Sequence, residues 1–152
     1  MPSPSDSKAK SLPVFINRRA RHDYEILDSY EAGIALQGAE VKSILQGKLN
    51  FTGAYCRVVD GELWLENMDI APYEQARAYA PPRQRPRKLL MHKQEIERLR
   101  RRIEEKGLTL IPTKVYFRNG KVKVEISLAR GKKRHDKREK LIEKAARREE
   151  KL

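Results

Sequence analysis

Three clusters of arginine and lysine carry the chemistry that this sequence offers most plainly. The first holds Arg18, Arg19 and Arg21, the second is the stretch 83–88, and the third runs through residues 131–152. A Lys or Arg that meets a phosphate releases counterions, which gives strong and salt-sensitive affinity for a polyanion. Five tyrosines have rings that can stack on unpaired bases, namely Tyr24, Tyr30, Tyr55, Tyr73 and Tyr79. These side chains favour the binding of RNA.

The sequence contains no recognisable set of catalytic residues. His22, His92 and His135 lie in separate segments, and none has a second ligand at the spacing of a metal site. Residues 131–133 lack the upstream glycine and the following Ser or Thr of a phosphate-binding loop. Cys56 falls in a predicted strand, where a buried structural thiol is expected. We predict a protein that is not an enzyme and needs no metal or cofactor; an active site assembled from distant positions is the alternative.

Length and composition limit the class of protein. The chain has 152 residues, 39% of them hydrophobic, which suits one domain with short appendages. Its 34 Lys and Arg against 21 Asp and Glu give a net charge of +13, as expected for the partner of an abundant polyanion. The single cysteine excludes an intrachain disulfide. Residues 1–13 lack the apolar run of a secretory signal, and no stretch reaches the length of a membrane span. We therefore expect a cytoplasmic protein without membrane contact.

Alternating apolar residues and glycine-marked turns predict several strands. One strand is predicted over 24–36, bent near Gly33. Asp60-Gly61 and Asn119-Gly120 each separate two apolar runs, and such pairs supply the positive φ values of a type I′ turn. Two hairpins are therefore predicted. In the second hairpin the residues expected to face the interior are Val122, Val124, Ile126 and Leu128.

Helical spacing predicts three helices between these strands. A short basic turn is expected over 17–22, and a helix over 37–46. The Arg- and Pro-rich stretch 83–88 is expected to be a connector that leads into a long amphipathic helix. The apolar stripe of that helix consists of Leu89, His92, Ile96, Leu99 and Ile103.

Together these elements predict a mainly β fold with flanking α-helices, arranged as an OB-like closed β-barrel. Residues 1–13 are expected to be a disordered lead-in, and residues 14–130 to form the barrel with its helices. Residues 131–152 hold too few apolar residues for a core of their own. This basic tail is expected to be disordered when free and helix-prone on a surface.

Four separated motifs in this chain resemble those of one known family. They are NRRARHDY at 17–24, EAGIALQGAEVKS at 31–43, RKLLMH at 87–92 and GKKRHDKR at 131–138. In order and spacing they are similar to the motifs of the SmpB (small protein B) family. The resemblance covers essentially residues 14–138, and four motifs together are far more specific than a basic tail alone.

The resemblance implies a concrete function. Members of the family are OB-like barrels that bind the tRNA-like domain of transfer-messenger RNA (tmRNA). The complex enters the A site of stalled ribosomes, where the body takes the place of an anticodon arm and the tail follows the empty messenger channel. The nascent peptide then moves to the RNA and is tagged for degradation. By this resemblance the partners are tmRNA and the ribosome, the protein is a monomer on RNA, and it makes no bond itself.

The resemblance also implies site residues. Glu31, Leu90 and His92 match positions that contact the tRNA-like domain, and His92 replaces an asparagine expected there, so the amide's donor-acceptor pair is lost. A histidine packed in the core is the alternative reading of His92. The further residues expected at this RNA are Arg18, Arg19, Arg21, His22, Lys42, Arg87 and Lys88. The tail residues expected at the ribosomal decoding centre are Gly131, Lys132, Lys133, His135, Asp136, Lys137 and Arg138.

Two other functions fit the residues less specifically. One is an OB-fold RNA-binding or ribosome-associated protein without a role in ribosome rescue. The other is a purely structural protein whose basic surface is incidental. Preference for tmRNA over bulk tRNA separates the first from the family function, and weak, unselective RNA binding marks the second.

Overall fold

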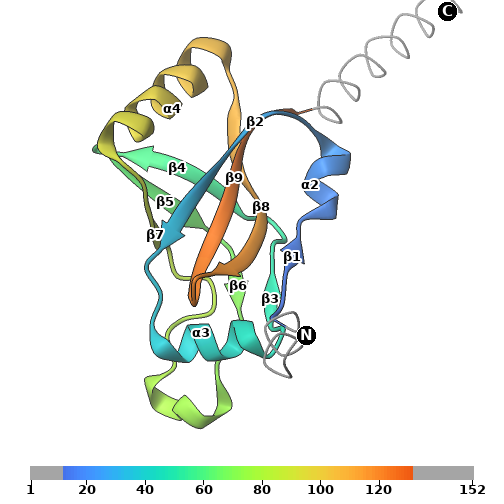
Figure 1. The fold of residues 1–152 in the computed structure, drawn as a ribbon, viewed down its shortest axis with the longest axis vertical. Helices are drawn as coiled ribbons and strands as arrows, with labels where there is room; N and C mark the ends of the chain where they lie inside the picture. Colours follow the sequence, from blue (N-terminus) through green and yellow to red (C-terminus); the bar gives the residue numbers. More distant parts are fainter. Residues whose placement is uncertain (1–11, 132–152) are drawn as a thin grey trace, which may run out of the picture.

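A computed structural model describes residues 12–131, and within this range the fold is mainly β with helices at its edges, as predicted (Figure 1). The predicted lead-in and tail fall largely on residues 1–11 and 132–152, outside the described residues. The strands are β1 (Phe15–Ile16), β2 (Tyr24–Ile34), β3 (Leu49–Asn50), β4 (Tyr55–Val59), β5 (Glu62–Glu66), β6 (Asp69–Ile70), β7 (Arg87–Leu90), β8 (Thr109–Arg118) and β9 (Lys121–Gly131). The helices are α2 (Arg18–Asp23), α3 (Gly38–Leu45), α4 (Lys93–Lys106) and the 3-10 helix η1 (Glu74–Tyr79).

The strand pairings of the main sheet return to the strand from which they start. In the described range β8 pairs with β4, β4 with β5, β5 with β7, β7 with β2 and β2 with β9, and β9 pairs again with β8. All of these pairings are antiparallel. Strand β1 adds to the edge of β8, while β3 and β6 form a separate pair. The β8–β4 join is the shortest of them, a single pair between Leu110 and Cys56.

Both predicted hairpins are confirmed. Asp60 and Gly61 have φ values of 51° and 75° between β4 and β5, and Asn119 and Gly120 have 52° and 74° between β8 and β9. The interior residues of β9 are confirmed too, because each of them is buried: Val122, Val124, Ile126 and Leu128. Cys56 lies in the same core, where burial raises the pKa of its thiol, so it is the buried structural cysteine that was expected.

The two shorter predicted helices are also confirmed. Helix α2 begins after Asn17, whose Oδ1 accepts the N–H of Ala20 at 3.1 Å and so caps the first turn. Helix α3 begins after Gln37, whose N–H donates to Oε1 of Glu40 at 2.9 Å. No helix among residues 12–131 combines the length and the apolarity that crossing a membrane requires.

The prediction for residues 83–103 is wrong at its N-terminal half. Leu89 does not begin the long helix; it lies in β7, 1% exposed and paired with Leu63 of β5. Helix α4 starts only at Lys93, with His92 as the residue before its first turn. The helical spacing of Leu89 and His92 is a coincidence. Residues 87–90 are a strand because they pair with β5. The pairing of β2 with β9 has a register irregularity between Ile26 and Asp28. A bend near Gly33 stays a prediction.

Candidate nucleic-acid interface

Glu31 meets Leu90 and His92 at one depression of the surface, although it lies about sixty residues before them in the sequence. The depression has a volume of about 450 Å³. Strand β2 supplies Glu31, β7 supplies Leu90, and His92 stands where β7 gives way to α4. Lys123 of β9 completes the rim. The register explains the meeting, because Gly33 of β2 pairs with Leu90 on one side and with Lys123 on the other.

Leu90 presents an apolar side chain to solvent in the lining of this depression. It is 52% exposed, whereas its neighbour Leu89 is buried, as the alternation of a strand requires. Gly33 lies directly opposite and has no side chain to cover it. A Cβ added at Gly33 would lie 3.3 Å from Cβ of Leu90, a distance at which Leu90 must shift. The glycine therefore leaves room for Leu90 in its observed position.

The carboxylate of Glu31 is oriented by two donors from β8. The hydroxyl of Tyr116 donates to Oε2, and Nη1 of Arg118 donates to the same oxygen at 2.9 Å. The Tyr116 hydrogen bond and the Arg118 charge hold the pKa of Glu31 below its ordinary value of 4.5. Burial and the bond to Glu31 raise the pKa of Tyr116 to about 12, so Tyr116 remains a donor at neutral pH. Glu31 is thus an ionised, preoriented acceptor.

His92 is exposed, so the alternative of a histidine packed in the core is wrong. Its carbonyl oxygen accepts the N–H groups of Glu95 and Ile96, each at 3.0 Å, which ties the start of α4 to the depression. The imidazole lines the depression itself and a neighbouring one that is formed mainly by α4. In that position the imidazole can hydrogen-bond to RNA or stack on a base, although an asparagine was expected there.

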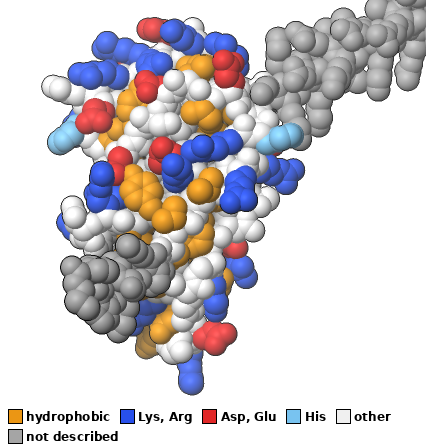
Figure 2. Space-filling view, turned by 45° about the vertical axis from the view of Figure 1, so that its right-hand side comes forward, with side chains coloured by type: hydrophobic (Ala, Val, Ile, Leu, Met, Phe, Trp, Pro, Cys, Tyr) orange, Lys and Arg blue, Asp and Glu red, His pale blue; other side chains and the backbone are white. Residues whose placement is uncertain are grey.

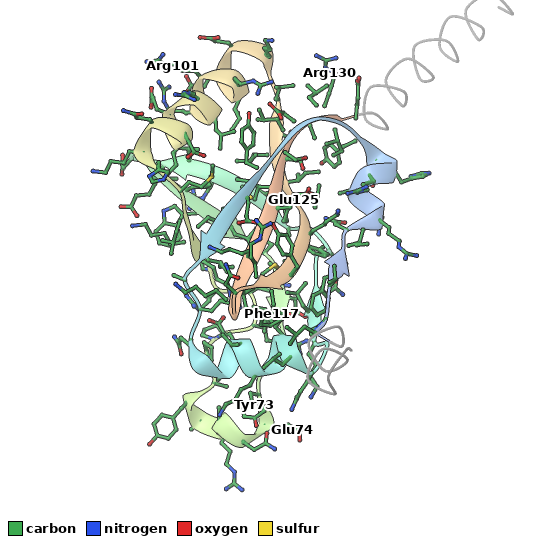
Figure 3. All side chains as sticks on the ribbon, in the orientation of Figure 1. Tyr73, Glu74, Arg101, Phe117, Glu125 and Arg130 are labelled. Atoms are coloured by element: carbon green, nitrogen blue, oxygen red, sulfur yellow. The ribbon has the colours of Figure 1, made fainter. Side chains whose placement is uncertain are left out.

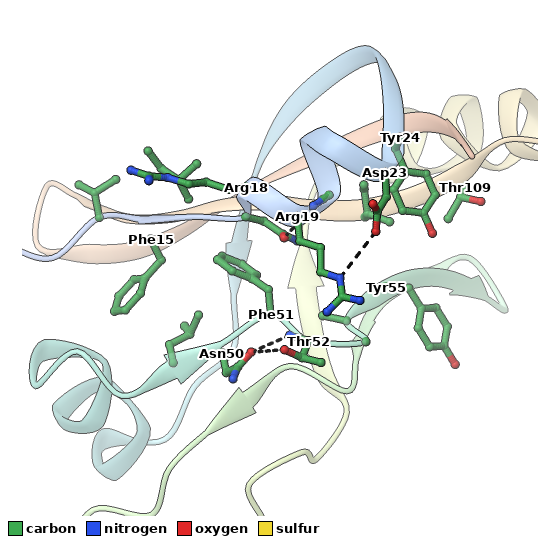
Figure 4. A pocket seen from close by; sticks show the side chains of 18 residues that line it. Phe15, Arg18, Arg19, Asp23, Tyr24, Asn50, Phe51, Thr52, Tyr55 and Thr109 are labelled. Atoms are coloured by element: carbon green, nitrogen blue, oxygen red, sulfur yellow. Dashed lines mark hydrogen bonds and ion pairs between the residues drawn. The ribbon is translucent and has the colours of Figure 1, made fainter. Parts of the chain in front are cut away.

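Arg18 and Arg19 lie elsewhere, on a groove of about 940 Å³ beside α2. Figure 4 shows Phe15, Phe51 and Tyr55 along this groove, with Arg19 turned toward Asp23 at 3.7 Å. In Figure 1, α2 stands on the opposite side of the fold from β7. Figure 2 shows hydrophobic side chains lying among Lys and Arg on one face of the molecule. The predicted basic residues therefore occupy more than one face.

The other predicted basic contacts are exposed but dispersed. Nη2 of Arg21 lies 3.9 Å from Oε2 of Glu125, and Nδ1 of His22 lies 3.1 Å from Oδ1 of the adjacent Asp23. Nζ of Lys88 lies 3.2 Å from Oε2 of Glu62. Lys42 belongs to α3, where Nζ lies 5.4 Å from the ring centre of Tyr73. None of these four lines the depression at Glu31.

The prediction that Arg87 contacts RNA is wrong, because its side chain is 0% exposed. Nε donates to Oε2 of Glu40 at 2.7 Å, Nη1 to the carbonyl of Met68 at 2.6 Å, and Nη2 to the carbonyl of Arg83 at 2.9 Å. The alternation of β7 turns Arg87 and Leu89 inward and Lys88 and Leu90 outward. Arg87 is therefore a structural residue that joins β7 to α3.

Three residues of this surface were not predicted: Lys123, Tyr116 and Arg118. They come from the second hairpin, and they reach Glu31 only through the pairing of β2 with β9 and of β9 with β8. Figure 3 shows Glu125 on the same sheet, and the register places it directly opposite Glu31. The alternating charges of residues 121–125 indicated that one side of this strand faces solvent. The sequence did not predict which strand pairs with it.

The tail residues are described only at their start. Gly131 pairs with Tyr24 at the end of β9, next to α2. Lys132, Lys133, His135, Asp136, Lys137 and Arg138 lie outside the described residues. Among residues 12–131, no group of three or more His, Cys, Asp and Glu is arranged to hold a metal ion.

Comparison with known proteins gives one consistent result. The family model described as SmpB protein matches residues 14–152. An SsrA-binding protein of Thermus thermophilus is 58% identical over 138 residues, 90% of this chain and 95% of its own. One of Desulforudis audaxviator is 54% identical over 133 residues, 88% and 87% of the two chains. A solved structure, "tmRNA-SmpB: a journey to the center of the bacterial ribosome", has a TM-score of 0.67 at 58% identity and covers 78% of this chain and 84% of that one. This chain belongs to the SmpB family.

Proposed function

We propose that this chain binds the tRNA-like domain of tmRNA and delivers it to the A site of stalled ribosomes. The observation that carries the proposal is the single depression in which Glu31, Leu90 and His92 meet. Relatives more than half identical to this chain are SsrA-binding proteins, and a similar solved structure is a tmRNA-SmpB complex of the bacterial ribosome. In this proposal the protein acts on the ribosome, and its location is therefore the cytoplasm.

The returning strand pairings support an OB-like closed barrel as the body of the protein. In this proposal residues 14–130 form the RNA-binding body, and residues 131–152 are a basic tail that follows the empty messenger channel. Both act by binding, so the chain makes and breaks no bond itself. The nascent peptide is transferred by the ribosome to the RNA.

Each residue of the depression offers the tRNA-like domain a different contact. The Glu31 carboxylate accepts a hydrogen bond from a base amino group or a ribose hydroxyl. Leu90 gives apolar contact to a base, and the His92 imidazole donates or stacks. Lys123 on the rim neutralises a phosphate. Recognition then depends on RNA shape together with a few polar contacts.

A competition assay tests this function. Labelled tmRNA is first bound to the protein at physiological salt. Unlabelled tmRNA should then displace it at a far lower concentration than bulk tRNA does. Salt must be held constant, because phosphate contacts alone weaken steeply as salt rises. Equal displacement by the two RNAs would show a general RNA-binding protein and contradict the proposal.

Replacement of Glu31 by alanine should weaken binding to the tRNA-like domain about tenfold or more, because hydrogen bonds to a charged group contribute about 1.5–3 kcal/mol. Thermal unfolding should barely change, since exposed ion pairs contribute only about 0–1 kcal/mol. Because the pKa of Glu31 is lowered, its contribution to RNA binding should persist below pH 4.5 and disappear as the pH falls through the lowered value.

Glu25→Ala is the matched control for Glu31→Ala. Glu25 lies on the same strand and is exposed, and its carboxylate lies 3.7 Å from Arg130, away from the depression. Both variants remove one negative charge, so an effect of charge alone would be equal in the two. Normal RNA binding by Glu31→Ala would remove Glu31 from the site.

A further inference from the structure

Residues 72–86 form a lobe that projects from the fold between β6 and β7. Figure 1 shows this lobe, with η1 at its tip, beneath α3 and at the opposite end of the molecule from α4. Figure 3 places Tyr73 and Glu74 there, far from Arg101 and Arg130. Neither the depression at Glu31 nor the groove beside α2 includes any residue of the lobe.

The base of the lobe is held by ion pairs to the body. Arg83 donates from Nε and Nη2 to the two oxygens of Asp69, each at 2.9 Å, and its carbonyl accepts the N–H of Ile70 at 3.0 Å. Nε of Arg85 donates to Oε2 of Glu40 at 3.1 Å. A bidentate arginine pair restricts geometry more than a single contact does. The lobe therefore presents its tip from a defined position.

The tip exposes an aromatic residue and a cationic residue. Tyr79 is 89% exposed, more than any other large hydrophobic residue of the described range. Arg77, two residues earlier, is exposed and has φ 49° and ψ −118°, a conformation that a side chain disfavours. Tyrosine is enriched at interfaces, and strained backbone conformations cluster at functional sites.

Lys42 extends the same surface onto α3. Its Nζ lies 5.4 Å from the ring centre of Tyr73, the residue that precedes η1. Within residues 12–131, neither Lys42 nor Arg77 has a carboxylate at ion-pair distance, whereas Arg83 and Arg85 do. Arg77 of the lobe and Lys42 beside its first residues are thus two cations without an acidic ion-pair partner in the described range, and Glu74 is the acidic residue of the lobe. This combination suits a strand of RNA, in which bases stack and phosphates bind cations.

We propose that the lobe is a second RNA-binding site, at which Tyr79 stacks on an unpaired base while Arg77 and Lys42 bind neighbouring phosphates. This inference rests on the proposed function, because it takes RNA as the partner. The base can belong to tmRNA or to ribosomal RNA, and the chemistry of the site is the same for both.

The test measures Tyr79→Ala against three partners: the isolated tRNA-like domain, whole tmRNA, and ribosomes stalled on truncated messenger in the presence of tmRNA. Loss of base stacking should weaken binding about 5- to 100-fold with the partner that supplies the base. Tyr79→Trp should restore binding, because it keeps a stacking ring. Thermal stability should be unchanged, since Tyr79 is almost fully exposed.

Two arginine variants separate the site from general electrostatics. Arg77→Gly removes the cation and suits the positive φ, so it should weaken binding to that partner without lowering stability. Arg101→Ala removes one exposed cation at the opposite end of the molecule and should weaken binding less. Equal losses in these two variants, or normal binding of Tyr79→Ala to all three partners, would overturn the inference. Failure of the wild-type chain to bind tmRNA would instead overturn the proposed function.

Discussion

Truncation after Gly131 is expected to abolish peptide tagging while leaving tmRNA binding nearly intact. The deleted residues 132–152 hold ten Lys and Arg against five Asp and Glu, and they include the positions expected at the decoding centre. The depression at Glu31 lies wholly within the remaining body. We expect tmRNA affinity to change by less than about tenfold, because the contacts that recognise the RNA shape stay in the body and the loss concerns general attraction between charges, which salt screens over about 8 Å. Tagging is measured with stalled ribosomes, and binding with purified tmRNA.

A tail of equal length and composition in scrambled order is the matched control for truncation. It keeps the net charge, so any general attraction to RNA persists. If order matters at the ribosome, the scrambled tail should fail in tagging and bind tmRNA like the wild type. Truncation that reduced both activities alike would contradict the division of labour between body and tail.

Replacement of Arg87 by alanine should be among the most destabilising single changes in the body. It leaves the buried Glu40 carboxylate with Arg85 as its one arginine partner in the described range and removes the donors to two carbonyls, of Met68 and Arg83. Breaking a buried ion pair costs about 3–5 kcal/mol, which corresponds to about 6–20 °C in melting temperature for a domain of this size. Thermal unfolding measures the loss directly.

The neighbouring residue supplies the control for Arg87→Ala. Lys88→Ala removes an exposed cation from the same strand and should leave the melting temperature nearly unchanged. The double variant Glu40→Ala, Arg87→Ala should cost less than the sum of its parts, because no unpaired charge remains buried. Additive losses, or a small loss in Arg87→Ala alone, would show that the pair is not the link between α3 and β7.

The same ion pair makes a contribution that depends on pH. Burial raises the pKa of Glu40, but hydrogen bonds from Arg85, from the N–H of Gln37 and from Arg87 outweigh it, and the pKa lies below 4.5. A carboxyl group whose pKa is lowered on folding stabilises the protein at pH values above the pKa that the group has in the unfolded chain. That stability is lost as the pH falls through the lowered pKa. Removal of the pair should therefore flatten the acid side of the stability profile.

Local patterns in the sequence predicted the elements that local physics determines. Asn119-Gly120 forms the expected turn because two positive φ values are needed there, and Asn17 begins a helix because its side chain caps it. The motif resemblance gave Glu31, Leu90 and His92 as one site, and the structure brings them together. That they contact RNA stays a prediction.

Long-range pairing determines what local patterns missed. Arg87 lies in an arginine-rich stretch that resembles an exposed connector, and only the alternation of β7 against β5 turns it toward Glu40. Lys123 and Tyr116 reach Glu31 through two strand registers that no local signal specifies. Such registers depend on the order of strands around the sheet, so composition and spacing within one segment do not reveal them.

The most direct measurement of the central claim is sequencing of the RNA that accompanies the protein when it is purified from its host under native conditions at physiological salt. The recovered RNA should be dominated by tmRNA, far above its share of total cellular RNA, with ribosomal RNA as the second component. RNA that mirrors the cell's total, or that contains no tRNA-like species, would contradict the claim that a folded body recognises one RNA shape.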